Sequence, residues 1–413
     1  MINFCLADYK HMYGGYDCDC GVTHTFNVKC LLSKGATKQI AAFLSDYAPF
    51  LSRIAIFYDD EEMLNAVVAN VKKEYRVTTV FARGDKKMTE QTQLAEDTKI
   101  IVALGSERAI SSAKYKAHLL DLPLVVSSFP YYSALSSQCV LDDDGAYCTC
   151  LVNKPCGYIF DTAYPLKRED RAELFGQISA RLLSAFEYYV TGIFDGIRYC
   201  PFIAGGLSDI AVKTIISLKD TSKDLPFLNE ILLNAALKQA IIASTDDLCV
   251  GGEIQCGLTY AMLEGDRSFA SSEFIFAAVL NKLYLSHVFR RKGFTPPPDN
   301  NLRLRHIAEL AGISEDKAIS KICPQISGKE AAIIEYKLNE YKMDIAEKLR
   351  ASLNLFKLAF RTFKRLRDDD GYALSMYKSA DVSLCIALAP DVIKGNGMLT
   401  ALKRLGELDC YIV

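Results

Sequence analysis

The sequence has few histidines and no large excess of charge of either sign. Only five of the 413 residues are histidine: His11, His24, His118, His287 and His306. Few imidazoles are therefore available to bind a metal ion. The 48 basic and 50 acidic side chains nearly cancel to a formal charge of −2. Because no block rich in lysine and arginine stands out, the sequence argues against a nucleic-acid partner.

Two kinds of targeting or anchoring segment are also missing. The N-terminal stretch MINFCLADYKHMYGG lacks a basic region followed by a long apolar core, so we expect no signal peptide. No apolar run reaches the roughly 18 residues that a membrane span needs. We therefore predict a cytoplasmic protein. Self-association into a homo-oligomer stays open at this point.

Cysteine, by contrast, is plentiful, with fourteen copies scattered along the chain. Two groups are denser: Cys18 and Cys20 with His24, and Cys148 and Cys150 with Cys156. Either group could supply zinc ligands, but neither has the C-x₂-C spacing of common structural zinc sites. In a reducing compartment we favour ordinary thiols that pack as small apolar groups, and keep zinc as the alternative.

The stretch from Lys99 to Tyr115, KIIVALGSERAISSAKY, predicts a strand, a tight turn and a helix. The apolar run Ile100–Leu104 is typical of a buried parallel strand, and Gly105 ends it. In an α/β sheet such a turn often binds phosphate at the N-terminus of the helix. Here only Gly105 is a glycine, and Glu107 puts a carboxylate where an anion would lie.

Strand and helix patterns alternate up to about Tyr164, and long helical patterns dominate after Pro165. We therefore predict an α/β N-terminal domain with a parallel, Rossmann-like sheet over residues 1–164 and an all-α C-terminal domain over residues 165–413. The predicted strands are Thr25–Leu32, Arg53–Tyr58, Val77–Phe81, Ile100–Leu104, Pro123–Ser127, Tyr147–Val152 and Tyr158–Phe160. The longer predicted helices are Gly35–Leu51, Glu61–Tyr75, Arg168–Thr191, Ser208–Lys219, Pro226–Ser244, Ser271–Arg290, Leu302–Leu310, Ser314–Ile322 and Gly328–Arg367.

Three motifs in this order resemble the glycerol-1-phosphate dehydrogenase family, part of the dehydroquinate synthase and iron-containing alcohol dehydrogenase superfamily. Asp17–His24, DCDCGVTH, resembles its D-C-x-C-G-x-x-H opening. Gly176–Arg181, GQISAR, resembles a G-D-x-x-[SA]-K segment, and Gly265–Phe274 resembles G-x-S-R-P-A-S-G-x-E-H with one residue fewer. The resemblance implies a divergent member with the dehydroquinate synthase-like fold.

Enzymes of that family reduce dihydroxyacetone phosphate with NADH or NADPH, aided by a divalent metal (zinc, nickel or iron). The resemblance puts the metal-binding aspartate at Gln177, the first histidine at Phe274 and the second at His287. An amide oxygen is a weaker ligand than a carboxylate, and a phenyl ring is no ligand at all. Because a catalytic ion needs about three protein ligands, we expect the metal to be absent.

The family's phosphate turn, G-G-G-S-x-x-D-x-x-K, falls on Gly105–Lys114, so only Gly105, Ser106 and Lys114 match it. A second family loop places Ser133 where an aspartate stands. Arg108 could offset the charge of Glu107 by contacting phosphate, although a solvated Glu107–Arg108 pair is the simpler interpretation. NAD(P), or a small phosphorylated ligand, therefore remains a candidate for Gly105, Ser106, Arg108, Lys114 and Ser133.

Three functions follow from this resemblance. In the first, the protein is a pseudoenzyme that has reduced or lost metal-dependent hydride transfer and keeps a binding or regulatory role. Alternatively it is an active NAD(P)-dependent oxidoreductase with a rearranged, metal-free site. A dehydroquinate synthase-like elimination is the least favoured, because it needs both the metal and the cofactor. No catalytic residue is identified from the sequence.

Overall fold

The computed structural model describes residues 16–26, 28–131, 133–143, 146–195, 199–219, 227–245, 251–264, 270–290, 328–367, 379–392 and 397–405. The chain divides into two compact units. The first comprises residues 1–167 and 226–247, and the second comprises residues 168–225 and 248–413. The helix α7, Leu228–Ser244, groups with the first unit, although the sequence interpretation put it in the helical domain. Its helical period predicts a helix but not which core the helix joins.

The first unit is built on a parallel six-stranded sheet with the order β3-β10-β7-β6-β4-β5. Its strands are β3 Lys29–Ser33, β4 Arg53–Tyr58, β5 Arg76–Phe81, β6 Thr98–Leu104, β7 Leu124–Ser127 and β10 Gly157–Asp161. Two small antiparallel hairpins accompany it: β1 Tyr16–Asp17 with β2 Thr23–His24, and β8 Gln138–Asp143 with β9 Ala146–Leu151. The parallel sheet that the alternating pattern predicts is thus confirmed.

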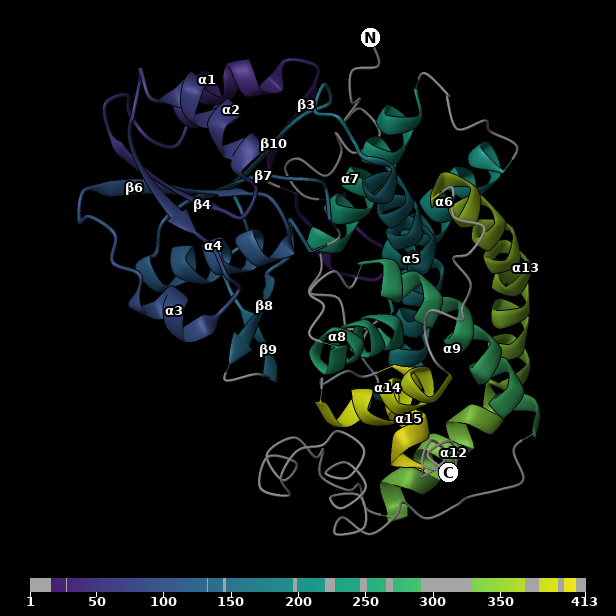
Figure 1. The fold of residues 1–413 in the computed structure, drawn as a ribbon. Helices are drawn as coiled ribbons and strands as arrows, with labels where there is room; N and C mark the ends of the chain where they lie inside the picture. The colour runs from purple at the N-terminus through teal and green to yellow at the C-terminus, as the bar shows by residue number, and fades with distance from the viewer. Residues whose placement is uncertain are drawn as a thin grey trace. The chain divides into compact units, whose positions relative to one another are not determined.

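Helices cover both faces of this sheet (Figure 1). The elements η2 Ala36–Gln39, α1 Ile40–Leu44 and α2 Glu61–Val71 lie on one face, and α3 Lys86–Gln91 and α4 Glu107–Leu120 on the other. Side chains of β6 alternate between the two faces, so Ile100 and Val102 pack with α1 and α2 in one core. A sheet that is covered on both faces explains why its strands read as unbroken apolar runs.

The second unit is helical throughout its described residues. Its elements are α5 Arg168–Asp195, α6 Pro201–Leu218, α8 Gly252–Glu264, α9 Ala270–Arg290, α12 Gly328–Glu340, α13 Lys342–Arg367, α14 Ser379–Val392 and α15 Met398–Arg404. The long helix α5 packs against α6, α9 and α13. The predicted all-α C-terminal part is therefore confirmed, while the predicted helices 302–310 and 314–322 lie outside the described residues.

Two predicted helices differ in detail from the structure. The one expected over Gly35–Leu51 is a 3₁₀ turn followed by the short α1, and the one expected over Gly328–Arg367 is interrupted between α12 and α13. The helix α6 is the one described helix long and apolar enough to cross a membrane by composition. Its buried side chains recur every three or four residues, which is also the pattern of a core helix with one buried face.

Asp161, at the end of β10, ties the start of η2 to the sheet. Its carboxylate accepts hydrogen bonds from the backbone N–H groups of Gly35 at 2.8 Å, Thr37 at 3.1 Å and Ala163 at 2.9 Å. Partial burial acts to raise the pKa of Asp161, but these N–H groups outweigh it and lower the pKa. The Asp161 carboxylate therefore stabilises the fold at pH values above the pKa that this aspartate has in the unfolded chain. The stabilisation is lost as pH falls through the lowered pKa of the folded state.

We expect Asp161→Asn to lower the free energy of unfolding by about 1–2 kcal/mol at pH 7, because the side chain loses its charge and its amide nitrogen cannot accept the bond that Oδ2 takes from Thr37. The difference from wild type should shrink as pH falls towards pH 3, because the charge-dependent stabilisation declines below the pKa of an unfolded aspartate, about 3.9. Urea unfolding at both pH values measures it. Asp46→Asn is the control, since the Asp46–Lys29 pair is about half exposed. An equal loss at pH 3 and pH 7 would contradict the role of the charge.

Candidate functional site

The strand order of the sheet reverses between β4 and β6. From β4 the chain continues outwards to β5, whereas from β6 it continues in the opposite direction to β7 and β10. In open α/β sheets, ligands bind outside the carboxyl ends of the strands at such a switch point. Asp59 directly follows β4 and Gly105 directly follows β6. The candidate cofactor site of the first unit is therefore the turn at Gly105, beside Asp59.

The turn at Gly105 is closed by the carboxylate of Asp59. Gly105 has a φ of +111°, and a Cβ atom there would collide with the Asp59 carboxylate. Asp59 Oδ1 accepts a hydrogen bond from the Ser106 N–H at 2.8 Å, and its Oδ2 accepts one from the Ser106 hydroxyl. Ser106 also caps α4, because its Oγ accepts from the Arg108 N–H at 3.2 Å.

A second carboxylate lies in the first turn of α4. Glu107 Oε1 accepts a hydrogen bond from the Ser133 hydroxyl at 2.7 Å. Arg108 is the nearby cation, with its Nε 3.9 Å from Asp59 Oδ2. The structure thus gathers Gly105, Ser106, Arg108 and Ser133 at one place, as the sequence interpretation grouped them. The N-terminus of α4 nevertheless already carries two acidic side chains, which oppose an incoming phosphate.

Lys114 lies further along α4, and its side chain hydrogen-bonds to the protein's own backbone. Its ammonium donates to the carbonyl oxygens of Ser133 at 2.5 Å, Ser136 at 2.8 Å and Gln138 at 3.0 Å. The side chain is buried, and burial lowers its pKa to about 7, against the opposing charges of Cys139 and Glu107. Three carbonyl acceptors match the three donors of an ammonium group. Lys114 therefore orders the segment from Ser133 to Gln138.

Two positions that the resemblance assigned to metal ligands, Gln177 and Phe274, are buried in the second unit. Phe274 on α9 is fully buried and contacts Phe356, Phe360 and Phe363 of α13, with ring centroids 5.1–6.5 Å apart. A Cβ atom on Gly176 of α5 would lie 3.2 Å from Phe274 Cβ, so the residue beside Gln177 packs directly on Phe274. Phe274, which the resemblance put at the first metal-histidine position, is thus part of an aromatic core.

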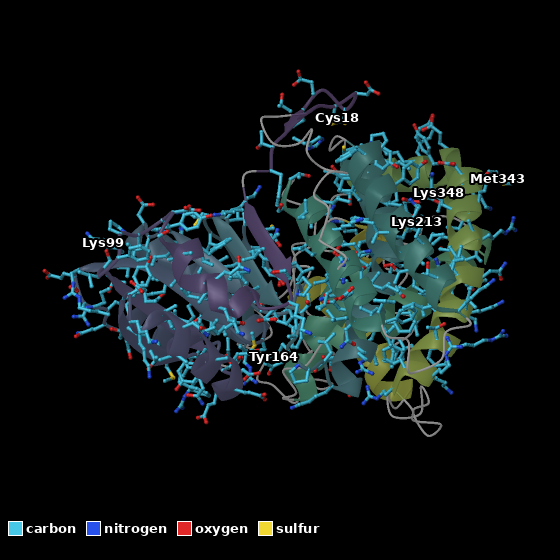
Figure 2. All side chains as sticks on the ribbon, turned by 90° about the horizontal axis from the view of Figure 1, so that it is seen from above. Cys18, Lys99, Tyr164, Lys213, Met343 and Lys348 are labelled. Carbon is cyan, nitrogen blue, oxygen red and sulfur yellow. The ribbon has the colours of Figure 1, made fainter. Side chains whose placement is uncertain are left out.

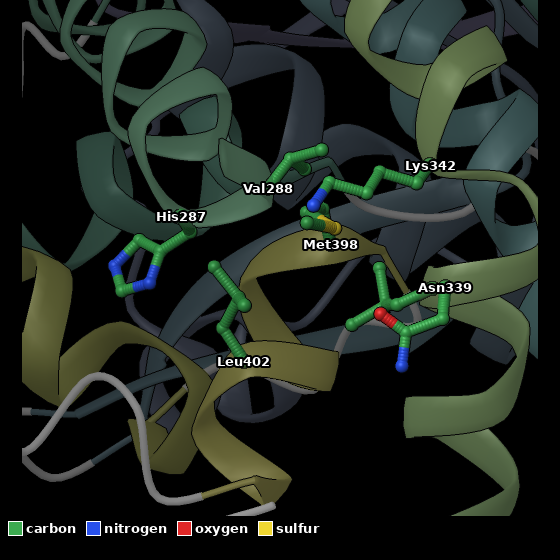
Figure 3. Close-up of a pocket in the computed structure, with 7 residues that line it drawn as sticks. His287, Val288, Asn339, Lys342, Met398 and Leu402 are labelled. Carbon is green, nitrogen blue, oxygen red and sulfur yellow. The ribbon is translucent and has the colours of Figure 1, made fainter. Parts of the chain in front are cut away.

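His287, the third family position, lies on the same continuous helix as Phe274, thirteen residues later. At 1.5 Å per residue this puts the two about 20 Å apart along the helix axis. His287 instead lines a small pocket with Val288, Lys342, Met398 and Leu402, opposite Asn339 (Figure 3). The cavity has a volume of about 10 Å³, which is room for about one water molecule and too little for a ligand. Gln177, Phe274 and His287 therefore do not fit a shared metal ion.

A buried ion-pair group lies beside the first two positions, and the sequence interpretation missed it. Arg181, on α5, is fully buried; its guanidinium pairs with Glu273 of α9 and lies 3.7 Å from Glu253 of α8. Burial raises the pKa of Glu253, while Arg181 and the Ser184 hydroxyl act to lower it. The sequence did contain a signal for this group, namely an arginine within an otherwise apolar helical pattern. A fixed guanidinium supplies positive charge here, close to the position of Phe274.

We expect Gly105→Ala to lower the free energy of unfolding by at least about 2–4 kcal/mol, since it adds backbone strain to a collision with Asp59. Gly35→Ala is the matched control: its φ is +82°, but no atom lies within 4 Å of the new Cβ. The control should lose only about 1 kcal/mol. Urea unfolding of both variants tests this. Equal losses would mean that Asp59 does not close the turn.

We expect Lys114→Met to lower the free energy of unfolding by about 2–4 kcal/mol, because three buried carbonyl groups lose their donor. Lys116→Met, on the same helix, should cost less, since the Lys116 ammonium donates to one carbonyl, that of Glu90. Limited proteolysis should also cut the 133–138 segment faster in Lys114→Met alone. Similar stability and proteolysis for both variants would refute the ordering role of Lys114.

No family model and no curated protein sequence matches this chain. Solved structures do match over nearly its whole length. They include maleylacetate reductase from Agrobacterium tumefaciens, at 13% identity and a TM-score of 0.58, covering 93% of this chain and 96% of that one. An archaeal Red Sea brine pool alcohol dehydrogenase matches at 10% identity and a TM-score of 0.59, covering 93% and 97%.

The NADH-dependent butanol dehydrogenase A of Thermotoga maritima matches at 14% identity and a TM-score of 0.54, covering 92% and 96%. An iron-containing alcohol dehydrogenase is among the further matches, at 12% identity and a TM-score of 0.50. Identities this low establish the architecture and not the reaction. The chain has the fold of the iron-containing alcohol dehydrogenase and dehydroquinate synthase-like enzymes.

Proposed function

We propose that this chain is a divergent glycerol-1-phosphate dehydrogenase-like protein that has lost metal-dependent hydride transfer and acts as a binding or regulatory protein. The observation that carries the proposal is the packing of Phe274. Its ring is fully buried against aromatic side chains of α13 at the position of a metal-binding histidine. An ion would have to displace this core as well as the neighbouring Arg181.

The turn at the switch point supports the same proposal. The Ser106 N–H in this turn is bound by Asp59, and Glu107 adds a second negative charge. A pyrophosphate group would have to displace Asp59 before the turn could bind it. Arg108 is half exposed and remains the residue suited to contact a small phosphorylated ligand in the cytoplasm.

A second candidate function is an active NAD(P)-dependent oxidoreductase with a rearranged, metal-free site. The observation in its favour is the place of Asp59, at the end of the strand next to the Gly105 turn. In dinucleotide-binding folds an acidic residue in such a position binds the ribose 2′-hydroxyl and disfavours the 2′-phosphate. This function therefore predicts NAD binding that is stronger than NADP binding and is weakened by Asp59→Ala.

We expect the purified chain, incubated with zinc, nickel or iron(II), to show no oxidation of NADH or NADPH with dihydroxyacetone phosphate above the protein-free rate. NAD, NADH and ADP should also leave its melting temperature unchanged. The assay is absorbance at the nicotinamide band together with a thermal-shift titration. Metal-dependent turnover would overturn the proposal. NAD binding with turnover that needs no metal would establish the second candidate instead.

A further inference from the structure

The N-terminal hairpin of the first unit brings three potential metal ligands together. The strands β1 and β2 pair antiparallel, with Tyr16 opposite His24 and Asp17 opposite Thr23. The turn between them is closed by hydrogen bonds from Gly21 N–H to the Cys18 carbonyl at 2.6 Å and from Cys18 N–H to the Val22 carbonyl at 3.2 Å. Gly21 has a φ of +75°, which a glycine adopts without strain.

The side chains of Cys18, Cys20 and His24 are buried, whereas Asp17, Asp19 and Gly21 to Thr23 are exposed. Figure 2 labels Cys18 on this hairpin. The two sulfur atoms and a ring nitrogen of His24 lie within 4.8 Å of one another. The sulfur and imidazole nitrogen atoms of the hairpin therefore lie together in a buried position, whereas its other polar groups face solvent.

These separations suit a tetrahedral zinc ion. With Zn–S near 2.3 Å and Zn–N near 2.0–2.1 Å, tetrahedral angles put ligand sulfurs about 3.8 Å apart and a sulfur and a nitrogen about 3.6 Å apart. The Cys20 Sγ–His24 Nε2 distance is 3.3 Å. Two thiolates and one imidazole are ligands that select zinc over magnesium or calcium.

The second cysteine group that the sequence singles out behaves differently. Cys148 and Cys150 lie on β9 and pack with Cys139 of β8. Cys156 packs against the sheet core instead, and its thiol donates to the Leu124 carbonyl at 3.1 Å. The predicted trio Cys148, Cys150 and Cys156 is thus not brought together as one ligand set, and no histidine joins it among the described contacts.

We propose that the hairpin of residues 16–24 binds a structural zinc ion through Cys18, Cys20 and His24. The ion's fourth ligand is a further thiolate of the chain or a water molecule. Two strands of two residues each are too short to hold this hairpin by pairing alone. Metal coordination supplies the missing stabilisation, as in other small metal-bound segments. This ion is separate from the family's catalytic metal and does not depend on the proposed function.

The test compares zinc content in three forms of the full chain purified from zinc-supplemented cells. We expect about one zinc per chain in the wild type, as for a structural site. Cys18→Ser/Cys20→Ser should lose it, and Cys148→Ser/Cys150→Ser, a matched C-x-C pair, should retain it. Chelation should lower the melting temperature of the wild type by about 5 °C or more and leave the hairpin variant unchanged.

A wild-type measurement covers the case in which the hairpin variant fails to fold. Zinc should protect Cys18 and Cys20 from alkylation, as mapped by peptide mass spectrometry, and cobalt(II) should give a thiolate-to-metal charge-transfer band. Zinc retained by the folded hairpin variant, or equal alkylation with and without zinc, would overturn the proposal. Loss of zinc from both double variants would also overturn the proposal, because that result would show adventitious binding to thiols.

Discussion

The interior of the helical unit depends on the buried charge of Arg181. Its guanidinium extends from α5 to carboxylates on α8 and α9, and none of the charged groups reaches solvent. A buried charge that loses its partner costs about 3–5 kcal/mol, so each of these helices must keep its place for the others to be stable. The same constraint fixes Glu273, and with it the neighbouring Phe274, against the aromatic side chains of α13.

The two places that we considered as candidate ligand sites are occupied by the chain's own groups. In the sheet unit the carboxylate of Asp59 takes the N–H that a phosphate would use. In the helical unit an aromatic core and a guanidinium lie at and beside Phe274, which the resemblance assigned to a metal ligand. The hairpin at residues 16–24 is the opposite case, because there the buried groups are good metal ligands and gather at one point.

The sequence predicted the sheet well because its strands are buried on both faces and read as apolar runs between helical patterns. The family resemblance grouped Gly105 and Ser106 with Ser133, and the Ser133 hydroxyl does donate to Glu107, the residue after Ser106. The sequence interpretation missed Asp59, which lies 47 residues before Ser106 in the chain and reaches it only through the pairing of β4 with β6. It also missed α8 and α14, because their apolar side chains are spread around the helix instead of forming one clear stripe.

The sequence by itself determined the fold class, because hydrophobic period is a local property, and the resemblance put Gln177 and Phe274 at metal-ligand positions. Only the tertiary structure decided what these two side chains contact. One continuous α9 separates His287 from Phe274, and three helices are needed to bring Arg181 to its carboxylates. Likewise, C-x-C spacing left Cys18 and Cys20 uncertain as ligands. Strand pairing settled their place, because it puts His24 within 3.3 Å of Cys20.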